Sequence, residues 1–183
     1  MGLLANTTSY LVGPVEMVDP SSGGWRDDVE NKLKQMGVVI YNPIKKPKWV
    51  SNNSKIHPSE RMAIINSGSE QADEIISSLV VDREICLRLA RSANWCFCNL
   101  PKILTYGTIE ELHVIKECGS PIIFVCPNGI PSTWILSMFV NDMSEVGTTF
   151  FKNVDLACEY LIKIDSGQLP IDPIKWIFLS WNK

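Results

Sequence analysis

The sequence predicts a doubly wound α/β protein with a mainly parallel, five-stranded sheet and helices on both faces. Two observations predict this fold class. Short apolar runs of strand length alternate along the chain with longer segments in which apolar residues recur at helical spacing. Turn and stop residues, among them Gly13, Pro14, Gly37 and Gly119, stand between these segments. The 183 residues suffice for one domain, 1–183, with a substantial core.

The first part of the chain contains two expected strands and at least one long helix. Residues 9–12 are an apolar run that ends in a turn, and residues 38–41 form a second such run. Between them a helix is expected over 25–36, because its apolar residues share one face and acidic residues stand in its first turn. The polar segment 42–69 holds three prolines and is expected to include a short helix at 60–66.

The rest of the chain continues the alternation of helices and strands. The expected elements are one or two helices over 70–92, a strand at 95–98, a helix over 108–118, a strand at 122–126, a fifth strand near 148–151, a helix over 154–164 and a packed apolar tail at 176–181. The architecture is therefore expected to be flavodoxin- or Rossmann-like. Ligands of such sheets bind beyond the carboxyl ends of the strands, where strand order reverses. This rule predicts a ligand site at the loops after the first and third strands.

Composition excludes several classes of function. The net charge is −3, so no overall basic field attracts a nucleic acid polymer. No apolar run approaches the roughly 20 residues of a membrane helix, and no signal peptide pattern opens the chain. We therefore expect a cytoplasmic protein with no membrane partner.

The cysteine and histidine pattern does not favour a metal site. Six cysteines form no C-x-x-C pair, and only two histidines are present. We expect buried, reduced thiols, and nothing in the sequence indicates a metal or an organic cofactor.

Residues 107–112 (GTIEEL) open the helix that follows the third expected strand. Gly107 permits a tight turn, and Thr108 is able to cap the first free amides. Glu111 is expected in the first turn, where the helix dipole favours its ionised form. A charged carboxylate at the ligand edge of a sheet suits nucleophilic attack or the binding of a sugar hydroxyl. The alternative is that Glu110 and Glu111 only complement the start of the helix.

Other segments extend this motif into a resemblance. They are, in chain order, 10–14 (YLVGP), 23–26 (GGWR), 39–43 (VIYNP), 131–138 (PSTWILSM) and 175–179 (KWIFL). Together with Gly107, Thr108 and Glu111, they resemble the nucleoside 2-deoxyribosyltransferase family. The similarity is greatest to the branch that is common in phage genomes, and it covers nearly the whole chain.

The resemblance implies cleavage or transfer at the N-glycosidic bond of 2′-deoxyribonucleosides or their 5′-monophosphates. Glu111 matches the glutamate that attacks C1′ and holds the deoxyribose as a covalent ester until a second base or water takes it. Tyr10 matches the tyrosine whose hydroxyl orients this glutamate, the alternative being a half-buried strand tyrosine. Gly13, Pro14 and Thr108 are expected to shape the pocket. The logic parallels that of retaining glycosidases.

The resemblance also implies partners. The ligand is expected to be a small-molecule nucleoside or nucleotide, on whose base Trp25 would stack. Members of the family assemble as oligomers in which a neighbour completes the pocket, so a homo-oligomer is expected. If a phage encodes the chain, its location is the host cytoplasm.

One departure from the family concerns the acid that protonates the leaving base. Where the family has an aspartate eight residues before another aspartate, this chain has Cys86 and Asn94. A thiol is a poor substitute acid, and general acid assistance is worth about 10²–10⁴ in rate. Asp82 lies one helical turn before Cys86 and is a substitute if the helix is continuous there. Arg83 is a candidate for contact with a phosphate or the sugar. A solvated helix charge is the alternative for both Asp82 and Arg83.

A second departure is Thr105, which stands where members acting on free nucleosides often have an acid. Relatives that hydrolyse 5′-monophosphates have a hydroxyl residue there, so Thr105 favours a phosphorylated ligand. An ordinary loop threonine is the alternative.

Two other functions remain open at this stage. A nucleotide-binding protein that kept the fold and lost the acid would explain Cys86 and Asn94. A cytokinin-activating type of phosphoribohydrolase shares the Gly-Thr-x-x-Glu pattern, but residues 104–106 (LTY) stand where that family has Pro-Gly-Gly.

Overall fold

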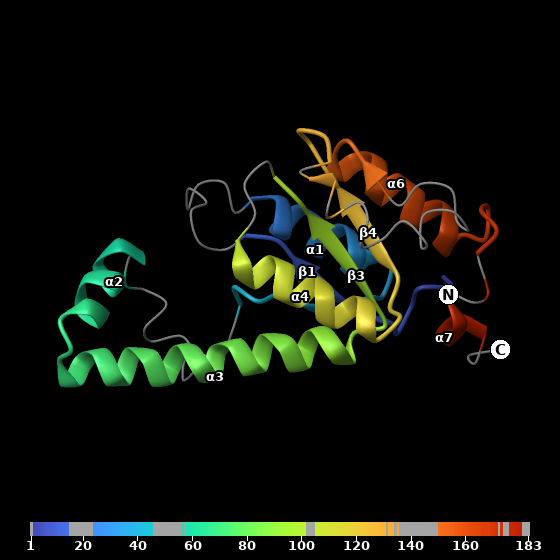
Figure 1. Cartoon of the computed structure of the whole chain (residues 1–183). Helices are drawn as coiled ribbons and strands as arrows, with labels where there is room; N and C mark the ends of the chain where they lie inside the picture. The colour runs from blue at the N-terminus through green and yellow to red at the C-terminus, as the bar shows by residue number, and fades with distance from the viewer. Residues whose placement is uncertain are drawn as a thin grey trace.

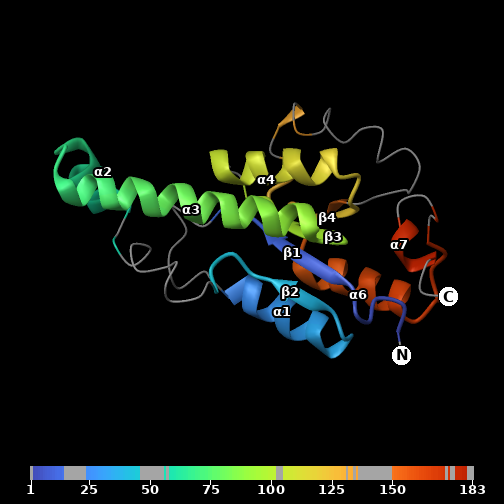
Figure 2. The ribbon, with the colours of Figure 1, turned by 90° about the horizontal axis from the view of Figure 1, so that it is seen from below.

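A parallel sheet lies between two layers of helices in the computed structural model of the chain (Figure 2). The structure describes residues 2–14, 24–45, 56, 58–101, 105–130, 132, 133, 135, 150–171, 173 and 176–180. Most of the expected segment 131–138 therefore lies outside the described residues, whereas residues 176–179 of the segment 175–179 lie within them.

The five described strands form one sheet with the order β2-β1-β3-β4-β5. They are β1 (Thr8–Val12), β2 (Val39–Tyr41), β3 (Trp95–Asn99), β4 (Ile122–Val125) and β5 (Phe150–Phe151). Every neighbouring pair is parallel. This confirms the predicted fold class, and the order is that of flavodoxin-like sheets. Strand order reverses between β1 and β3, so the loops after these strands flank the switch point, as predicted.

Two helices cover each face of the sheet (Figure 2). On one face lie α3 (Glu70–Ser92) and α4 (Tyr106–Glu117), and on the other lie α1 (Gly24–Gln35) and α6 (Val154–Asp165). Two shorter helices, α2 (Pro58–Asn66) and α7 (Ile177–Ser180), lie outside these layers. The segment 70–92 is a single helix.

The core follows from the alternation of side chains along buried strands. Tyr10 of β1 and Cys96 and Cys98 of β3 pack with residues of α3 and α4. Leu11 and Phe97 point the other way and pack with residues of α1 and α6. The side chain of Tyr10 therefore meets α4 because of its register in the strand.

The apolar tail packs on the body, as predicted for the part that the structure describes. Trp176 is buried, and its ring lies 6.0 Å from that of Trp95. Leu179 is buried beside it in the same cluster.

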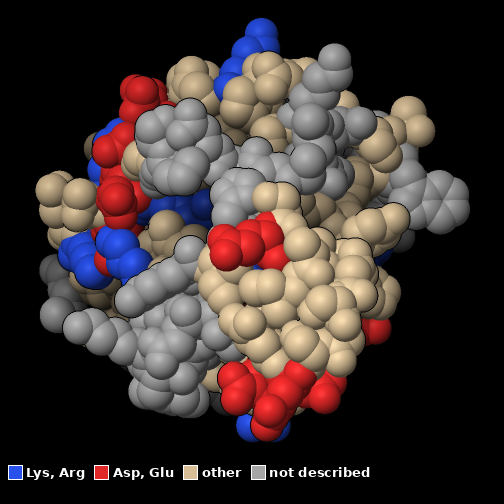
Figure 3. All heavy atoms as spheres, turned by 90° about the vertical axis from the view of Figure 1, so that its left-hand side faces the viewer, with Lys and Arg blue, Asp and Glu red and all other residues tan. Residues whose placement is uncertain are grey.

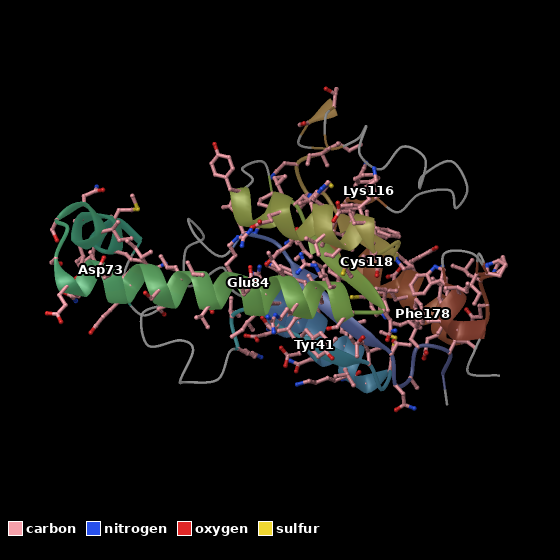
Figure 4. All side chains as sticks on the ribbon, turned by 60° about the horizontal axis from the view of Figure 1, so that its bottom comes forward. Tyr41, Asp73, Glu84, Lys116, Cys118 and Phe178 are labelled. Carbon is pink, nitrogen blue, oxygen red and sulfur yellow. The ribbon has the colours of Figure 1, made fainter. Side chains whose placement is uncertain are left out.

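The helix α2 and the first half of α3 project from the body as an arm, which we define as residues 58–81 (Figure 1). Figure 4 shows Asp73 on the arm and Glu84 farther along α3, where the helix passes the body. Viewed toward the tip of the arm, the surface carries separate groups of acidic side chains on a mainly uncharged background (Figure 3). Ala72 and Ile75 are buried, and α2 packs against α3.

The thiols differ partly from expectation. All six cysteines are free, and four are buried, but Cys118 at the end of α4 is exposed and Cys86 is half-buried. Within the described ranges, no helix is long and apolar enough to cross a membrane, and no cluster of three or more metal-ligating side chains occurs.

Candidate active site

The structure brings Tyr10 and Glu111 together at the switch point of the sheet. The Tyr10 hydroxyl donates a 2.6 Å hydrogen bond to Oε1 of Glu111. Tyr10 comes from β1, whose register points its ring toward α4, and Glu111 comes from α4 itself. The tyrosine is fully buried, whereas the carboxylate is half-buried. The carboxylate therefore lies where the core meets the surface, which is where a ligand could reach it.

The surroundings of Tyr10 keep its proton in place. Burial raises the pKa of the phenol far above its ordinary value, and the negative charge of Glu111 raises it further. The phenol is therefore a permanent hydrogen-bond donor at any physiological pH. A permanent donor orients a carboxylate without taking or losing a proton.

Cys86 lies beside this pair. It stands at the position where the family that the sequence resembles has an aspartate. A hydrogen bond links its side chain to Tyr10, and it packs against the same cluster. Since α3 is continuous through residues 82–86, Asp82 lies one turn earlier on the same helix. Asp82 is partly buried, and its Oδ1 is shielded from solvent. Asp82 was expected as a substitute acid only if the helix is continuous there, and it is.

Arg83 forms a surface clamp between α3 and α4. Its Nε donates to Oε2 of Glu110 at 2.9 Å, its Nη2 contacts Oε1 of Glu110, and its Nη1 bonds Glu84 at 3.1 Å. These contacts give Arg83 and Glu110 a structural role, because they join α3 to α4. They also fix α3 next to the residue that precedes Glu111.

Asn94 lies beside Thr8 at the start of β1, whereas the turn beside the candidate site follows the end of that strand. Its Oδ1 accepts hydrogen bonds from the amide of Thr8 at 2.8 Å and from the Thr8 hydroxyl at 2.9 Å. Asn94 therefore secures the start of β1 and β3, and only the Cys86 departure concerns the site.

The start of α4 corrects three expectations. The helix begins at Tyr106, because Thr105 is its N-cap and accepts a 3.4 Å hydrogen bond from the Thr108 amide. Thr108 does not cap the helix but is buried and shares a 3.0 Å hydroxyl contact with Thr105. Gly107 lies within the first turn and is not among the described glycines with positive φ, so no tight turn needs it. Glu111 consequently lies in the second turn, where the helix dipole acts more weakly than expected.

The turn after β1 contains the glycine that the backbone does require. A Cβ on Gly13 would lie 2.9 Å from the Asn99 carbonyl oxygen, 3.1 Å from Cζ2 of Trp25 and 3.3 Å from Nη2 of Arg26. Trp25 stacks on Phe97 with ring centroids 6.2 Å apart, and the Arg26 guanidinium lies 4.5 Å from the Trp25 ring centroid. The indole is thus packed within the protein, and stacking on a base remains a prediction.

Arg26 is the residue of this region that sequence reasoning missed. The residue is 2% exposed, and its guanidinium donates hydrogen bonds to the carbonyls of Gly13 and Pro14. The only signal was its place at the end of the GGWR segment, where a charged residue at a helix start is normally solvated.

Two solved structures share this architecture. The 2-deoxyribosyltransferase from Bacillus psychrosaccharolyticus is 18% identical with a TM-score of 0.54, and the match covers 91% of this chain and 98% of that one. The 2-deoxyribosyltransferase from Leishmania mexicana is 17% identical with a TM-score of 0.53, over 86% of this chain and 97% of that one. No family model and no curated protein matches the sequence. The chain therefore has the fold of 2-deoxyribosyltransferases, which confirms the fold that the sequence resemblance implied.

Proposed function

We propose that the protein is an enzyme of the N-glycosidic bond, which cleaves or transfers the deoxyribosyl group of 2′-deoxyribonucleosides or their 5′-monophosphates. The observation that carries this proposal is the Tyr10–Glu111 hydrogen bond at the switch point of the sheet. The shared fold of two 2-deoxyribosyltransferases supports it.

In the proposed reaction, Glu111 is the nucleophile. Its carboxylate forms a bond to C1′ while the bond from C1′ to the base nitrogen breaks, and the base leaves with the electron pair and takes up a proton. A second base or water then forms a bond to C1′ while the bond from C1′ to Glu111 breaks, and its proton passes to the group that protonated the first base. Tyr10 orients the attacking oxygen, and the ester divides one difficult displacement into two easier ones.

The proton for the leaving base is assigned to Asp82. The side chain of Cys86 is next to Tyr10, but a thiol is a weak acid near neutral pH. Asp82 is the carboxyl group one turn away on the same helix. In this proposal Gly13, Pro14 and Thr108 shape the pocket, and Trp25 contacts the base.

The nature of the ligand at the 5′ position belongs to the proposal as well. Thr105 carries no charge to repel a phosphate, although its hydroxyl already caps α4. Arg83 would have to exchange Glu110 for a phosphate in order to bind it. We therefore propose both 2′-deoxynucleosides and their 5′-monophosphates as substrates.

Base release tests the proposed function. The protein is incubated with each 2′-deoxynucleoside or its 5′-monophosphate, with and without a free acceptor base, and released or exchanged base is followed by chromatography. Glu111→Gln should abolish turnover, whereas Glu117→Gln, an exposed carboxylate on the same helix, should leave it unchanged. Undiminished turnover by Glu111→Gln would refute the role of Glu111.

The rival function is a nucleotide-binding protein without catalysis, and the observation that favours it is the thiol beside Tyr10. It predicts ligand binding with no base release over long incubation. Base release by the unmodified protein separates the two, and Cys86→Asp tests whether a lost acid limits the rate. A rate gain of about 10²-fold or more indicates an enzyme that lost its acid, and no change indicates either another acid or no catalysis.

A homo-oligomer is also part of the proposal. Three apolar side chains on the arm segment of α3 are 44–56% exposed, namely Ile76, Val80 and Val81. Met62 of α2 is exposed as well. Apolar side chains gathered on a projecting element support contact with a second copy of the chain.

A further inference from the structure

Arg83 of α3 and Glu110 of α4 form a forked ion pair. Nε of Arg83 donates to Oε2 of Glu110 at 2.9 Å, and Nη2 donates to Oε1 of the same carboxylate. Two parallel hydrogen bonds of this kind fix the relative orientation of the two groups as well as their separation. Nη1 bonds Glu84 on the same helix at 3.1 Å, which further orients the guanidinium. The pair therefore defines how α3 and α4 lie against each other at this point.

The chain neighbours of this pair are the groups of the proposed reaction. Arg83 directly follows Asp82, and Glu110 directly precedes Glu111. Successive residues of a helix point about 100° apart, so the side chains of Asp82 and Glu111 do not point in the direction of the ion pair. What the ion pair fixes is the backbone from which these two side chains extend.

Apolar packing does not hold this part of α3. The structure describes the whole of the helix, and none of its residues between Ile75 and Leu87 is buried. Leu87 packs in the core, whereas Ile75 lies on the arm, where α3 packs against α2. Arg83 lies between these two anchors, where α3 passes α4 (Figure 2). The ion pair is therefore a specific polar contact that holds this stretch of α3 against α4.

The same geometry argues against a phosphate contact by Arg83. Nε and Nη2 are the donors that a phosphate would use in a forked contact, and both are bonded to Glu110. The carboxylate of Glu110 would also repel a phosphate at this place. The arrangement favours the joining of helices over the binding of a ligand.

We propose that Arg83 and Glu110 are positioning residues, whose ion pair sets the spacing between the stretch of α3 that carries Asp82 and Cys86 and the turn of α4 that carries Glu111. The two side chains are 53% and 36% exposed, and exposed ion pairs contribute little to stability. The pair therefore serves geometry more than folding. The consequence for catalysis rests on the proposed function, whereas the consequence for the packing of α3 requires no substrate.

A set of charge variants tests the pair. Arg83→Gln and Glu110→Gln each remove one partner, and the double variant removes both. Arg83→Glu combined with Glu110→Arg exchanges the two charges and allows the pair to form again. Arg91→Gln on α3 and Glu117→Gln on α4 change exposed charges elsewhere on the same helices, and both should leave every measurement unchanged.

The rate at which iodoacetamide alkylates Cys86 tests the position of α3 without substrate. Cys86 follows Arg83 by about one helical turn and is half-buried, whereas Cys118 at the end of α4 is exposed and serves as an internal reference. We expect the Cys86 rate, followed by peptide mass spectrometry, to rise about 3- to 10-fold in each single variant and no further in the double variant. The Cys118 rate should not change.

The two single variants change the local charge in opposite directions. A change in thiolate character would therefore move the two Cys86 rates in opposite directions, so a rise in both indicates that α3 has moved away from α4. An unchanged Cys86 rate in folded Arg83→Gln and Glu110→Gln would overturn the proposal.

The kinetics of base release test the consequence for catalysis. We expect kcat to fall about 10- to 100-fold in both single variants, for the 2′-deoxynucleoside and the 5′-monophosphate alike, with KM within about 3-fold of its original value. The charge-exchanged variant should recover part of this loss. The urea midpoint should shift by less than about 0.5 M in all variants. A lowered urea midpoint with unchanged kcat would mean a merely structural role.

Two other outcomes are decisive. A rise in KM that is confined to the 5′-monophosphate and to Arg83→Gln would overturn the proposal in favour of a phosphate contact. If the unmodified protein releases no base, the proposed function fails, while the alkylation rates still decide whether the ion pair positions α3.

Discussion

Tyr10 and Glu111 are separated by 101 positions in the sequence, yet a single 2.6 Å hydrogen bond joins them. The donor is fixed by the core, since the ring is fully buried and its pKa is raised by burial and by Glu111. The acceptor lies on the edge of a helix. A rigid donor and a partly exposed acceptor form a pair that is organised before any ligand arrives, which is what positioned catalysis requires.

Removing the Tyr10 hydroxyl tests this preorganisation. Tyr10→Phe keeps the ring in the core, so we expect the free energy of unfolding to change by about 1 kcal/mol or less. The carboxylate loses its orienting donor, so kcat for base release should fall about 10- to 100-fold with little change in KM. Tyr41→Phe, on the neighbouring strand and packed against the same cluster, is the control. Full activity in Tyr10→Phe would contradict the assignment.

Elements meet closely where β1 ends, and Gly13 makes that approach possible. Gly13→Ala places a methyl group 2.9 Å from the Asn99 carbonyl oxygen, so something must shift. We expect a loss of about 2 kcal/mol in the free energy of unfolding, measured in urea, and a matching loss of base release. Gly107→Ala meets nothing within 4 Å and should be neutral or stabilising by about 0.5 kcal/mol. Equal effects at both positions would disprove the close-packing account.

A second junction links α1 to the segment after β2 through Glu30. Glu30 is 6% exposed, and its carboxylate accepts hydrogen bonds from Lys34 at 2.6 Å, Asn42 at 2.9 Å and Lys45 at 3.0 Å. Burial alone would raise its pKa, but the three donors outweigh burial and lower the pKa to about 2. Asn42, part of the segment that resembles the family, is thereby explained by structure.

The lowered pKa of Glu30 makes stability depend on pH. An unfolded glutamate titrates near pH ~4.3, so the stabilisation is complete above that value and is lost as the pH falls toward about 2. Glu30→Gln should cost about 2 kcal/mol at pH 7, and the difference from wild type in urea unfolding should vanish by about pH 2. Glu117→Gln, whose partner His113 is exposed, should change stability by less than about 0.5 kcal/mol. A pH-independent difference would exclude the ionic explanation.

The parallel sheet and the loops beside its switch point could be predicted, because buried parallel strands form apolar runs and their connections follow a handedness rule. The start of α4 could not, because Thr105 and Thr108 are both able to cap a helix and only their hydroxyl geometry decides. The burial of Arg26 could not be predicted for a related reason. It depends on a contact with the turn after β1, and no local sequence pattern indicates that contact.

At the scale of the whole molecule, packing within the domain does not explain the exposed apolar residues of the arm. Val80→Lys places a charge among its exposed apolar residues while leaving the folded chain unchanged, since Val80 is 56% exposed. If copies of the chain meet there, the variant should shift light-scattering mass toward the monomer. Gln71→Lys, another exposed position of α3, should not. A monomeric wild type, or an oligomer that Val80→Lys leaves intact, would show that the arm does not form an interface between copies.

The 23 residues of α3 continue without interruption from the arm into the core, over about 35 Å. Leu87 and Ala90 anchor one end, whereas the other end packs against α2 and projects from the body (Figure 1). Backbone amides along this one helix should therefore exchange with deuterium at graded rates, slowest near Ala90 and fastest toward Glu70. Slowing of the outer amides as protein concentration rises would reveal, residue by residue, how far a neighbour shields the helix.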